Sequence, residues 1–166
     1  MFSPLPASFY ERSTLVAARQ LLGARLVRLL DGELLSGIIC ETEAYIGMED
    51  LGCHARSGRT RRNAVMFGPA GHAYVYFTYG NHWMVNAVTE AEGFPAAVLL
   101  RAIIPQQGLE TIRERRQGRD TFGPGKLTAA LGIDGTLNGA ALFNKKAGLW
   151  IEAGEPVAEA QVLTGA

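Results

Sequence analysis

Two glutamates, Glu41 and Glu43, lie two positions apart near the end of the apolar run ELLSGIICETEAY (33–45). Because side chains at positions i and i+2 of a strand point to the same face, the two carboxylates are expected side by side. A carboxylate at a strand end beside a loop is well placed as a general base, which accepts a proton from water. On the pair alone, the alternative that both are ordinary solvent-facing strand residues is favoured.

The segment HAYVYFTYGNHW (72–83) is rich in aromatic residues. In an extended strand Tyr74 and Tyr76 share one face, and Phe77 and Tyr79 share the other. Core packing explains one aromatic face more easily than two, because a buried tyrosine hydroxyl needs a hydrogen-bond partner. An aromatic surface beside a basic loop also suits stacking on nucleic-acid bases. Both interpretations stay open on these residues alone.

The turn GPGKL (123–127) matches the phosphate-binding P-loop only in part. The P-loop pattern needs a glycine where this chain has Asp120, and a serine or threonine where it has Leu127. What remains is a glycine-rich turn that opens a helix with Lys126 at its start, which suits contact with one phosphate.

Motifs for metal binding, cofactor binding and serine-hydrolase chemistry are absent from the sequence. It contains no CxxC, HExxH, GxSxG, GxGxxG or CxxCH pattern, and the adjacent Cys53 and His54 are poorly spaced for chelation. A lone histidine such as His54 is more often a packed or surface residue than a catalytic one. We therefore expect no metal and no cofactor.

Charge and composition narrow the class of protein. The 166 residues carry 16 basic and 16 acidic side chains, which excludes a simple polycation but allows a local basic face. Arginines concentrate in residues 56–62 and 113–119. Their planar side chains suit contacts with phosphate, but segments like these are equally often solvated surface loops, so both interpretations stay open. The chain has two cysteines, too few for a disulfide framework, which predicts a reducing compartment. Cys40, which follows Ile38 and Ile39, is interpreted as a core residue. No signal peptide or membrane span is recognisable, so we expect a cytoplasmic protein.

The elements that must position these residues are mainly strands. Asp31-Gly32 suits a type I′ turn between strands 24–30 and 33–45, and Pro105 is expected to end a strand over 96–104. Strands in the middle and helices towards the ends predict an α+β fold with a largely antiparallel sheet. The remaining expected elements are strands 72–79, 83–89 and 149–153 and helices 14–22, 109–117 and 126–131.

Seven segments in order resemble the alkyladenine (3-methyladenine) DNA glycosylase family. They are ETEAYIG (41–47), the His54 loop with Arg62, Asn63, Met66 and Phe67, AYVYFTYG (73–80), Asn86, VLLRA (98–102), GLETIRERR (108–116) and GPGKLTAALGI (123–133). Each is weak alone, but their order and spacing make the set specific over about 15–152. The resemblance implies a single domain over 1–166, with a curved antiparallel sheet flanked by helices. It also implies a nucleoid-associated monomer that binds double-stranded DNA containing alkylated purines, flips one nucleotide out and hydrolyses its N-glycosidic bond.

The same resemblance assigns catalytic roles. Glu43 is expected to be the general base, with Arg101 helping to hold the attacking water. A carboxylate there would also stabilise an oxocarbenium-like transition state. Lys126 is a weaker candidate for phosphate contact, and no lysine matches a position near Glu43, so we expect monofunctional hydrolysis.

Recognition residues are likewise implied by the resemblance. Tyr45, His54 and Tyr76 are expected to wall the pocket for the flipped base. Tyr79 is expected to fill the vacated stack, because an extruded base leaves a gap in the duplex. Asn86 is expected to disfavour the exocyclic amine of normal guanine.

The end of the sequence departs from the family pattern, and two other functions compete. Family members generally continue after a strand like 149–152 into a further strand and a basic, aromatic segment, whereas 153–166 is rich in alanine and glutamate. A non-catalytic nucleic-acid-binding module would use the same basic loops and aromatics. A metal-independent nucleoside hydrolase would use the carboxylate. The full pocket set favours the glycosylase over the binding module, and Tyr79 with the arginine-rich loops favours duplex DNA over a nucleoside.

Overall fold

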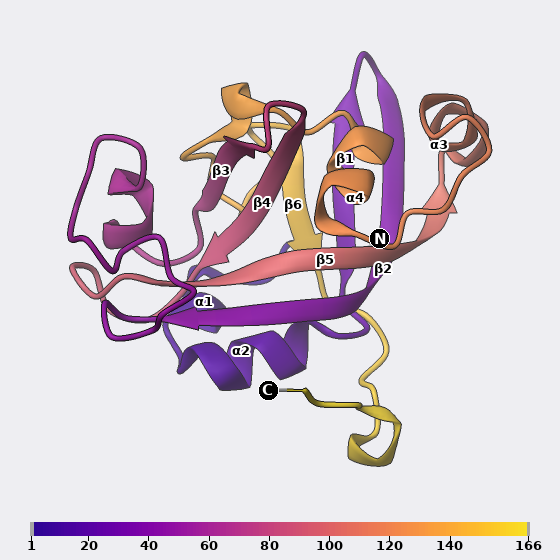
Figure 1. The fold of residues 1–166 in the computed structure, drawn as a ribbon. Helices are drawn as coiled ribbons and strands as arrows, with labels where there is room; N and C mark the ends of the chain where they lie inside the picture. Colours follow the sequence, from indigo (N-terminus) through magenta and orange to yellow (C-terminus); the bar gives the residue numbers. More distant parts are fainter. Residues whose placement is uncertain (1, 166) are drawn as a thin grey trace.

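A six-stranded sheet forms the centre of the computed structural model, which describes residues 2–165 (Figure 1). The strand order is β3-β4-β5-β2-β1-β6, and every neighbouring pair is antiparallel. The sheet curves strongly, with helices packed against it, so the prediction of an α+β fold is confirmed. The strands are β1 (Arg25–Leu30), β2 (Glu33–Ile46), β3 (Ala73–Thr78), β4 (His82–Val88), β5 (Ala96–Gln107) and β6 (Leu149–Glu152).

The β1–β2 hairpin forms where the sequence predicted it. Asp31 and Gly32 both adopt positive φ, at 52° and 81°, as the two central residues of a type I′ turn must. The prediction that Pro105 ends β5 is wrong, because β5 continues to Gln107 with Pro105 paired to Gly37. β4 pairs with β5 only up to Leu99, and the isolated bridge between Ala102 and Phe122 also lies before Pro105. The last residues of β5 therefore have a locally open edge, where a proline without an N–H is tolerated.

Four α-helices accompany the sheet within residues 2–165: α1 (Ala7–Tyr10), α2 (Thr14–Leu21), α3 (Leu109–Arg115) and α4 (Pro124–Leu131). α2 lies along β2 and β5, and α4 packs against β4 and β5 (Figure 1). The Ser13 hydroxyl accepts the Val16 N–H at 3.4 Å and caps α2 as expected. α4 begins two residues before its predicted start, with Pro124 in its first turn. No helix in the described part of the chain combines the length and apolarity needed to cross a bilayer.

Two apolar clusters hold the fold together. The larger one joins the sheet to α2 and α4, with Leu21, Ile103 and Leu127 fully buried. The prediction that Cys40 is a core residue is wrong: its side chain is exposed, because Cys40 lies at the register shift between Ile39 and Glu41, where the regular alternation of β2 is interrupted. The smaller cluster lies beneath the loop that follows β2 and consists of Cys53, Ala55, Met66, Tyr74, Val88 and Ala97.

Candidate active site

The site is built on one row of residues that crosses four strands. Directly paired residues of an antiparallel sheet point to the same face. One such row brings together Tyr74 of β3, Asn86 of β4, Leu99 of β5 and Glu43 of β2. Residues distant in sequence thus meet because of strand register. Two positions along β5 from Leu99, Arg101 lies on the same face.

Glu43 is held by two hydrogen bonds at the end of β2. The Tyr45 hydroxyl donates to Glu43 Oε1 at 2.6 Å, and Arg101 Nη1 donates to Glu43 Oε2 at 2.5 Å. Arg101 Nε also donates to Glu41 Oε1 at 2.9 Å, so both glutamates lie on one face as predicted. This arrangement holds a carboxylate in a fixed orientation at the sheet surface, as a general base requires.

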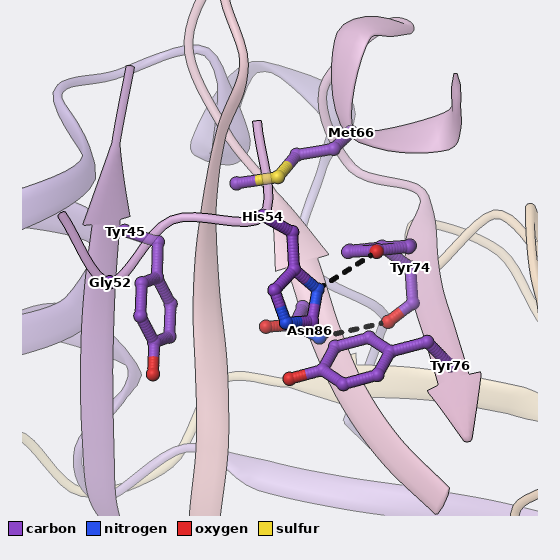
Figure 2. Close-up of a pocket in the computed structure, with 7 residues that line it drawn as sticks. All are labelled: Tyr45, Gly52, His54, Met66, Tyr74, Tyr76 and Asn86. Carbon is purple, nitrogen blue, oxygen red and sulfur yellow. Dashed lines mark hydrogen bonds between the residues drawn. The ribbon is translucent and has the colours of Figure 1, made fainter. Parts of the chain in front are cut away.

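Next to Glu43, and lined by its hydrogen-bond partner Tyr45, lies a small open hollow. Figure 2 shows Tyr45 on one side of it and the rings of His54, Tyr74 and Tyr76 on the other. The His54 and Tyr76 ring centroids are 4.4 Å apart, and those of Tyr74 and Tyr76 are 5.1 Å apart. Gly52, Met66 and Asn86 complete the lining. The structure therefore brings the three expected wall residues, Tyr45, His54 and Tyr76, around one hollow.

The titratable rings of the hollow are kept neutral. Burial, and then the positive charge of Arg62, lower the pKa of His54 below its ordinary value. Burial, helped by the hydrogen bond to Glu43, raises the pKa of Tyr45, and burial raises the pKa of Tyr74 to about 12. The His54 Nδ1 atom lies 3.2 Å from the Tyr74 hydroxyl, which fixes the plane of the imidazole. At neutral pH the hollow is thus lined by uncharged aromatic rings.

Asn86 lies at the back of this hollow with its side-chain amide fixed (Figure 2). Its side chain is almost fully buried, and Nδ2 donates to the backbone carbonyl of Tyr74 at 3.0 Å. Only the amide nitrogen can donate to that carbonyl, so the orientation of the group is set. Asn86 therefore pairs with the backbone and also lines the hollow.

Tyr79 stands at the tip of the β3–β4 hairpin. Tyr79 and Gly80 form the centre of the turn with φ of 54° and 70°, and the Asn81 N–H donates to the Thr78 carbonyl. The predicted turn residues Gly80 and Asn81 lie in this turn, and Tyr79, which was predicted to end the strand, belongs to the turn as well. Tyr79 is 87% exposed, so its ring projects away from the protein. A non-glycine residue with positive φ is uncommon and strained, which often marks a functional position.

A model of the methylpurine-DNA glycosylase family matches residues 8–166 of this chain. The chain belongs to this family. It is 50% identical to a protein of Carboxydothermus hydrogenoformans over 163 residues, which are 96% of this chain and 84% of the relative. It is 48% identical to a protein of Chlorobaculum parvum (89% and 72% covered) and 50% identical to one of Myxococcus xanthus (97% and 79% covered). All three relatives are named as candidate 3-methyladenine DNA glycosylases.

Membership of the methylpurine-DNA glycosylase family confirms the resemblance drawn from the seven segments. It also confirms the expected class of enzyme, a DNA glycosylase of alkylated bases that acts in DNA repair. The roles of individual residues remain predictions.

Two side chains that support the hollow and the loop beside it had no role assigned from the sequence. Asp50 accepts the N–H groups of Ile46 and Gly52 at 3.1 and 2.9 Å, which closes the turn after β2. The buried Asn63 donates to the carbonyls of His54 and Gly58 at 3.0 and 3.1 Å. These bonds hold together the loop of residues 47–63 that follows β2, here called the pocket loop. The pattern of short polar residues around Asn63 was the available signal, because asparagine commonly pairs with nearby backbone in turns.

Arg62 joins the pocket loop to β3. Its Nη2 donates to the Phe77 carbonyl at 2.8 Å, and its guanidinium lies 5.5 Å from the centre of the Tyr76 ring. The other arginines of this loop, Arg56, Arg59 and Arg61, are exposed. The exposed arginines are compatible with both alternatives that the sequence left open, a phosphate-binding face and a solvated surface loop.

Lys126 lies outside the pocket lining. Its Nζ pairs with Asp120 at 3.1 Å in the first turn of α4, and both side chains are about half exposed. Among residues 2–165, no three His, Cys, Asp or Glu side chains are grouped closely enough to hold a metal ion.

Proposed function

We propose that the protein is a monofunctional glycosylase that removes alkylated purines of the 3-methyladenine type from duplex DNA during base excision repair. The observation that carries this proposal is the hydrogen bond between Tyr45 and Glu43. It joins one wall of an aromatic hollow to a carboxylate. A purine held against the Tyr45 ring would have its sugar beside that carboxylate.

Capture of the base begins with extrusion from the helix. Flipping a nucleotide costs a few kcal/mol, least for a damaged base, and leaves a gap in the stack. The exposed Tyr79 ring is the group available to fill that gap. The exposed arginines of the 56–62 loop are the groups available to bind flanking phosphates.

The pocket favours a purine that carries a positive charge. Alkylation of a ring nitrogen makes the base cationic while it is still attached to the sugar. The faces of Tyr45 and Tyr76 would attract this cation by roughly 0.5–2 kcal/mol per ring. His54 adds a third ring to the pocket. Because its pKa is lowered, the ring is neutral at pH 7 and does not repel the cationic base.

Hydrolysis then needs one water and one base. The bond between C1′ and the purine nitrogen breaks, and both electrons leave with the purine, so a cationic base departs neutral. The sugar becomes an oxocarbenium ion, which the negative charge of Glu43 stabilises. The water oxygen bonds to C1′ and its proton passes to Glu43, while Arg101 restrains the carboxylate. An abasic site remains.

Selection against normal guanine is assigned to Asn86. Stacking alone accepts any purine, because every base has a π-face. The fixed Asn86 amide lies at the back of the hollow, where a guanine amine would clash or lose a hydrogen bond. Such discrimination costs the wrong substrate a few kcal/mol without having to help the right one.

The deciding experiment incubates the protein with methylated duplex DNA and measures free 3-methyladenine by chromatography. Glu43→Gln is the matched control, since it removes the base but keeps the shape of the side chain. Release by the wild type and its loss in the variant are expected. Binding of methylated duplex with no release by the wild type would instead favour the non-catalytic module. Release from a free nucleoside alone would favour the nucleoside hydrolase.

A further inference from the structure

Arg101 is shared between two carboxylates of the same strand. Its Nε donates to Glu41 at 2.9 Å and its Nη1 donates to Glu43 at 2.5 Å. The arrangement depends on an irregularity in the β2–β5 ladder, where the register shifts on both sides of Glu41. Glu41 pairs with Ala102 and Thr42 with Leu100, so Arg101 faces the point of the shift. The bulge thus brings both glutamates within reach of one guanidinium.

This geometry differs from the usual pairing of arginine with a single carboxylate. A guanidinium commonly donates two parallel N–H groups to the two oxygens of one carboxylate. Here the guanidinium gives Glu43 one donor, and Glu41 takes the Nε–H. The second oxygen of Glu43 is bonded to the Tyr45 hydroxyl. Each oxygen of Glu43 therefore has one protein donor and keeps a lone pair for water.

We propose that Glu41 is a positioning residue, which holds Arg101 by its Nε and so prevents the guanidinium from closing on both oxygens of Glu43. The proposal rests on the proposed function, in which Glu43 accepts a proton from water. Without Glu41, Arg101 would be free to rotate into a two-donor pairing through its two Nη groups, which leaves the Nε–H without a carboxylate. Glu43 would then accept three protein donors instead of two, which makes it a weaker base.

Other roles for Glu41 are less consistent with the structure. Glu41 does not line the hollow, and its side chain is 54% exposed, so it is poorly placed as a second base. An exposed ion pair also contributes little to folding stability. Burial alone would lower the pKa of Arg101, but the hydrogen bond to Glu41 and the charges of Glu43 and Glu41 raise it overall. The guanidinium is thus firmly cationic and firmly held.

The test compares single-turnover release of 3-methyladenine from methylated duplex DNA by Glu41→Ala and Glu41→Gln. Removing the side chain should slow release by about 10- to 100-fold, part of the 10²–10⁴ that a positioned general base contributes. Glutamine keeps an oxygen for the Nε–H, so its rate should stay within about fivefold of wild type. Lesion binding should change less than about threefold in both. Glu159→Ala, which removes the exposed ion pair with Arg19, is the matched control and should release base at the wild-type rate.

A second arm isolates the pairing mechanism. Lysine carries a point charge and cannot donate two parallel N–H groups. In an Arg101→Lys background, Glu41→Ala should therefore slow release by less than about threefold. The proposal would be overturned if Glu41→Ala slowed base release by the same factor in the wild-type and Arg101→Lys backgrounds. It would also be overturned if Glu41→Gln slowed release as much as Glu41→Ala, or if Glu41→Ala weakened lesion binding without changing the rate of release.

A readout without catalysis separates this proposal from the proposed function. The Arg101 Nε–H signal in ¹⁵N NMR spectra should show a hydrogen-bonded proton in wild type and in Glu41→Gln. In Glu41→Ala it should exchange rapidly with water. An unchanged signal in Glu41→Ala would refute the positioning role even if the wild type released no base.

Discussion

Replacing Tyr79 with asparagine is expected to make the protein more stable and worse at capturing a lesion. Tyr79 occupies the first central position of the β3–β4 turn with φ of 54°. A residue with a Cβ atom pays roughly 1–2 kcal/mol in that left-handed region, and asparagine pays least among non-glycine residues. Because the Tyr79 ring is 87% exposed, its removal loses little buried apolar area.

The expected gain follows from these two terms. Relief of about 0.5–1 kcal/mol should raise the melting temperature by about 1–4 °C in a chain of this length. Tyr79→Ala is the matched control, because alanine also lacks the ring but remains strained at positive φ. Both variants should therefore lose lesion capture equally, and only asparagine should gain stability.

Two measurements check this prediction. Thermal unfolding by calorimetry gives the stability difference between the asparagine and alanine variants. Fluorescence of a base analogue placed opposite the lesion reports the flipping equilibrium. Equal melting temperatures for the two variants would refute the strain argument. A flipping equilibrium like that of wild type in both variants would refute the role of Tyr79 as a wedge.

Three further predictions concern the pocket and its base. Glu43→Gln should slow base release by about 10²–10⁴-fold with lesion binding within a few-fold, and comparable turnover would remove Glu43 from the mechanism. Asn86→Ser should raise kcat/KM for release of guanine-type bases relative to 3-methyladenine, and an unchanged ratio would make Asn86 purely structural. The lowered pKa of His54 means that the unfolded chain binds more protons as pH falls through the ordinary histidine range. The free energy of unfolding should therefore drop more between pH 7 and about pH 5.5 in wild type than in His54→Gln, and equal drops would contradict this.

Local signals predicted most elements because they act over a few residues. The Asp31-Gly32 turn and the Ser13 cap are examples, since each depends on the conformation of one or two residues. α1 escaped prediction because it is four residues long and has no side-chain cap. The end of β5 was mispredicted at Pro105, because a strand can include a proline where its neighbour does not need the missing N–H. Whether that holds depends on how far β4 extends along β5, which local sequence does not show.

The candidate site was predictable as a set of residues, and its geometry was not. Family resemblance grouped Glu43, Asn86 and Tyr76, but the register that places Glu43 and Asn86 in one row depends on long-range pairing. The bulge at Glu41 has no marker in the sequence, and it decides that Arg101 contacts two carboxylates. Cys40 was misplaced for a related reason, because the face of a strand residue follows from register.

The site divides between strands, which carry the proposed catalytic groups, and a loop and a turn, which carry groups proposed to recognise the base. Glu43 and Arg101 lie on β2 and β5, the two longest strands, which pair along most of their length. Rigid strands hold a catalytic group more precisely than loops do. His54 and Tyr79 instead lie on a loop and a turn, where side chains can meet a duplex of varying shape. Tyr45 connects the two parts, because its ring lines the hollow while its hydroxyl holds Glu43. A base that seats properly against Tyr45 is thereby placed beside an oriented carboxylate, so recognition of the base and hydrolysis of its bond depend on one side chain.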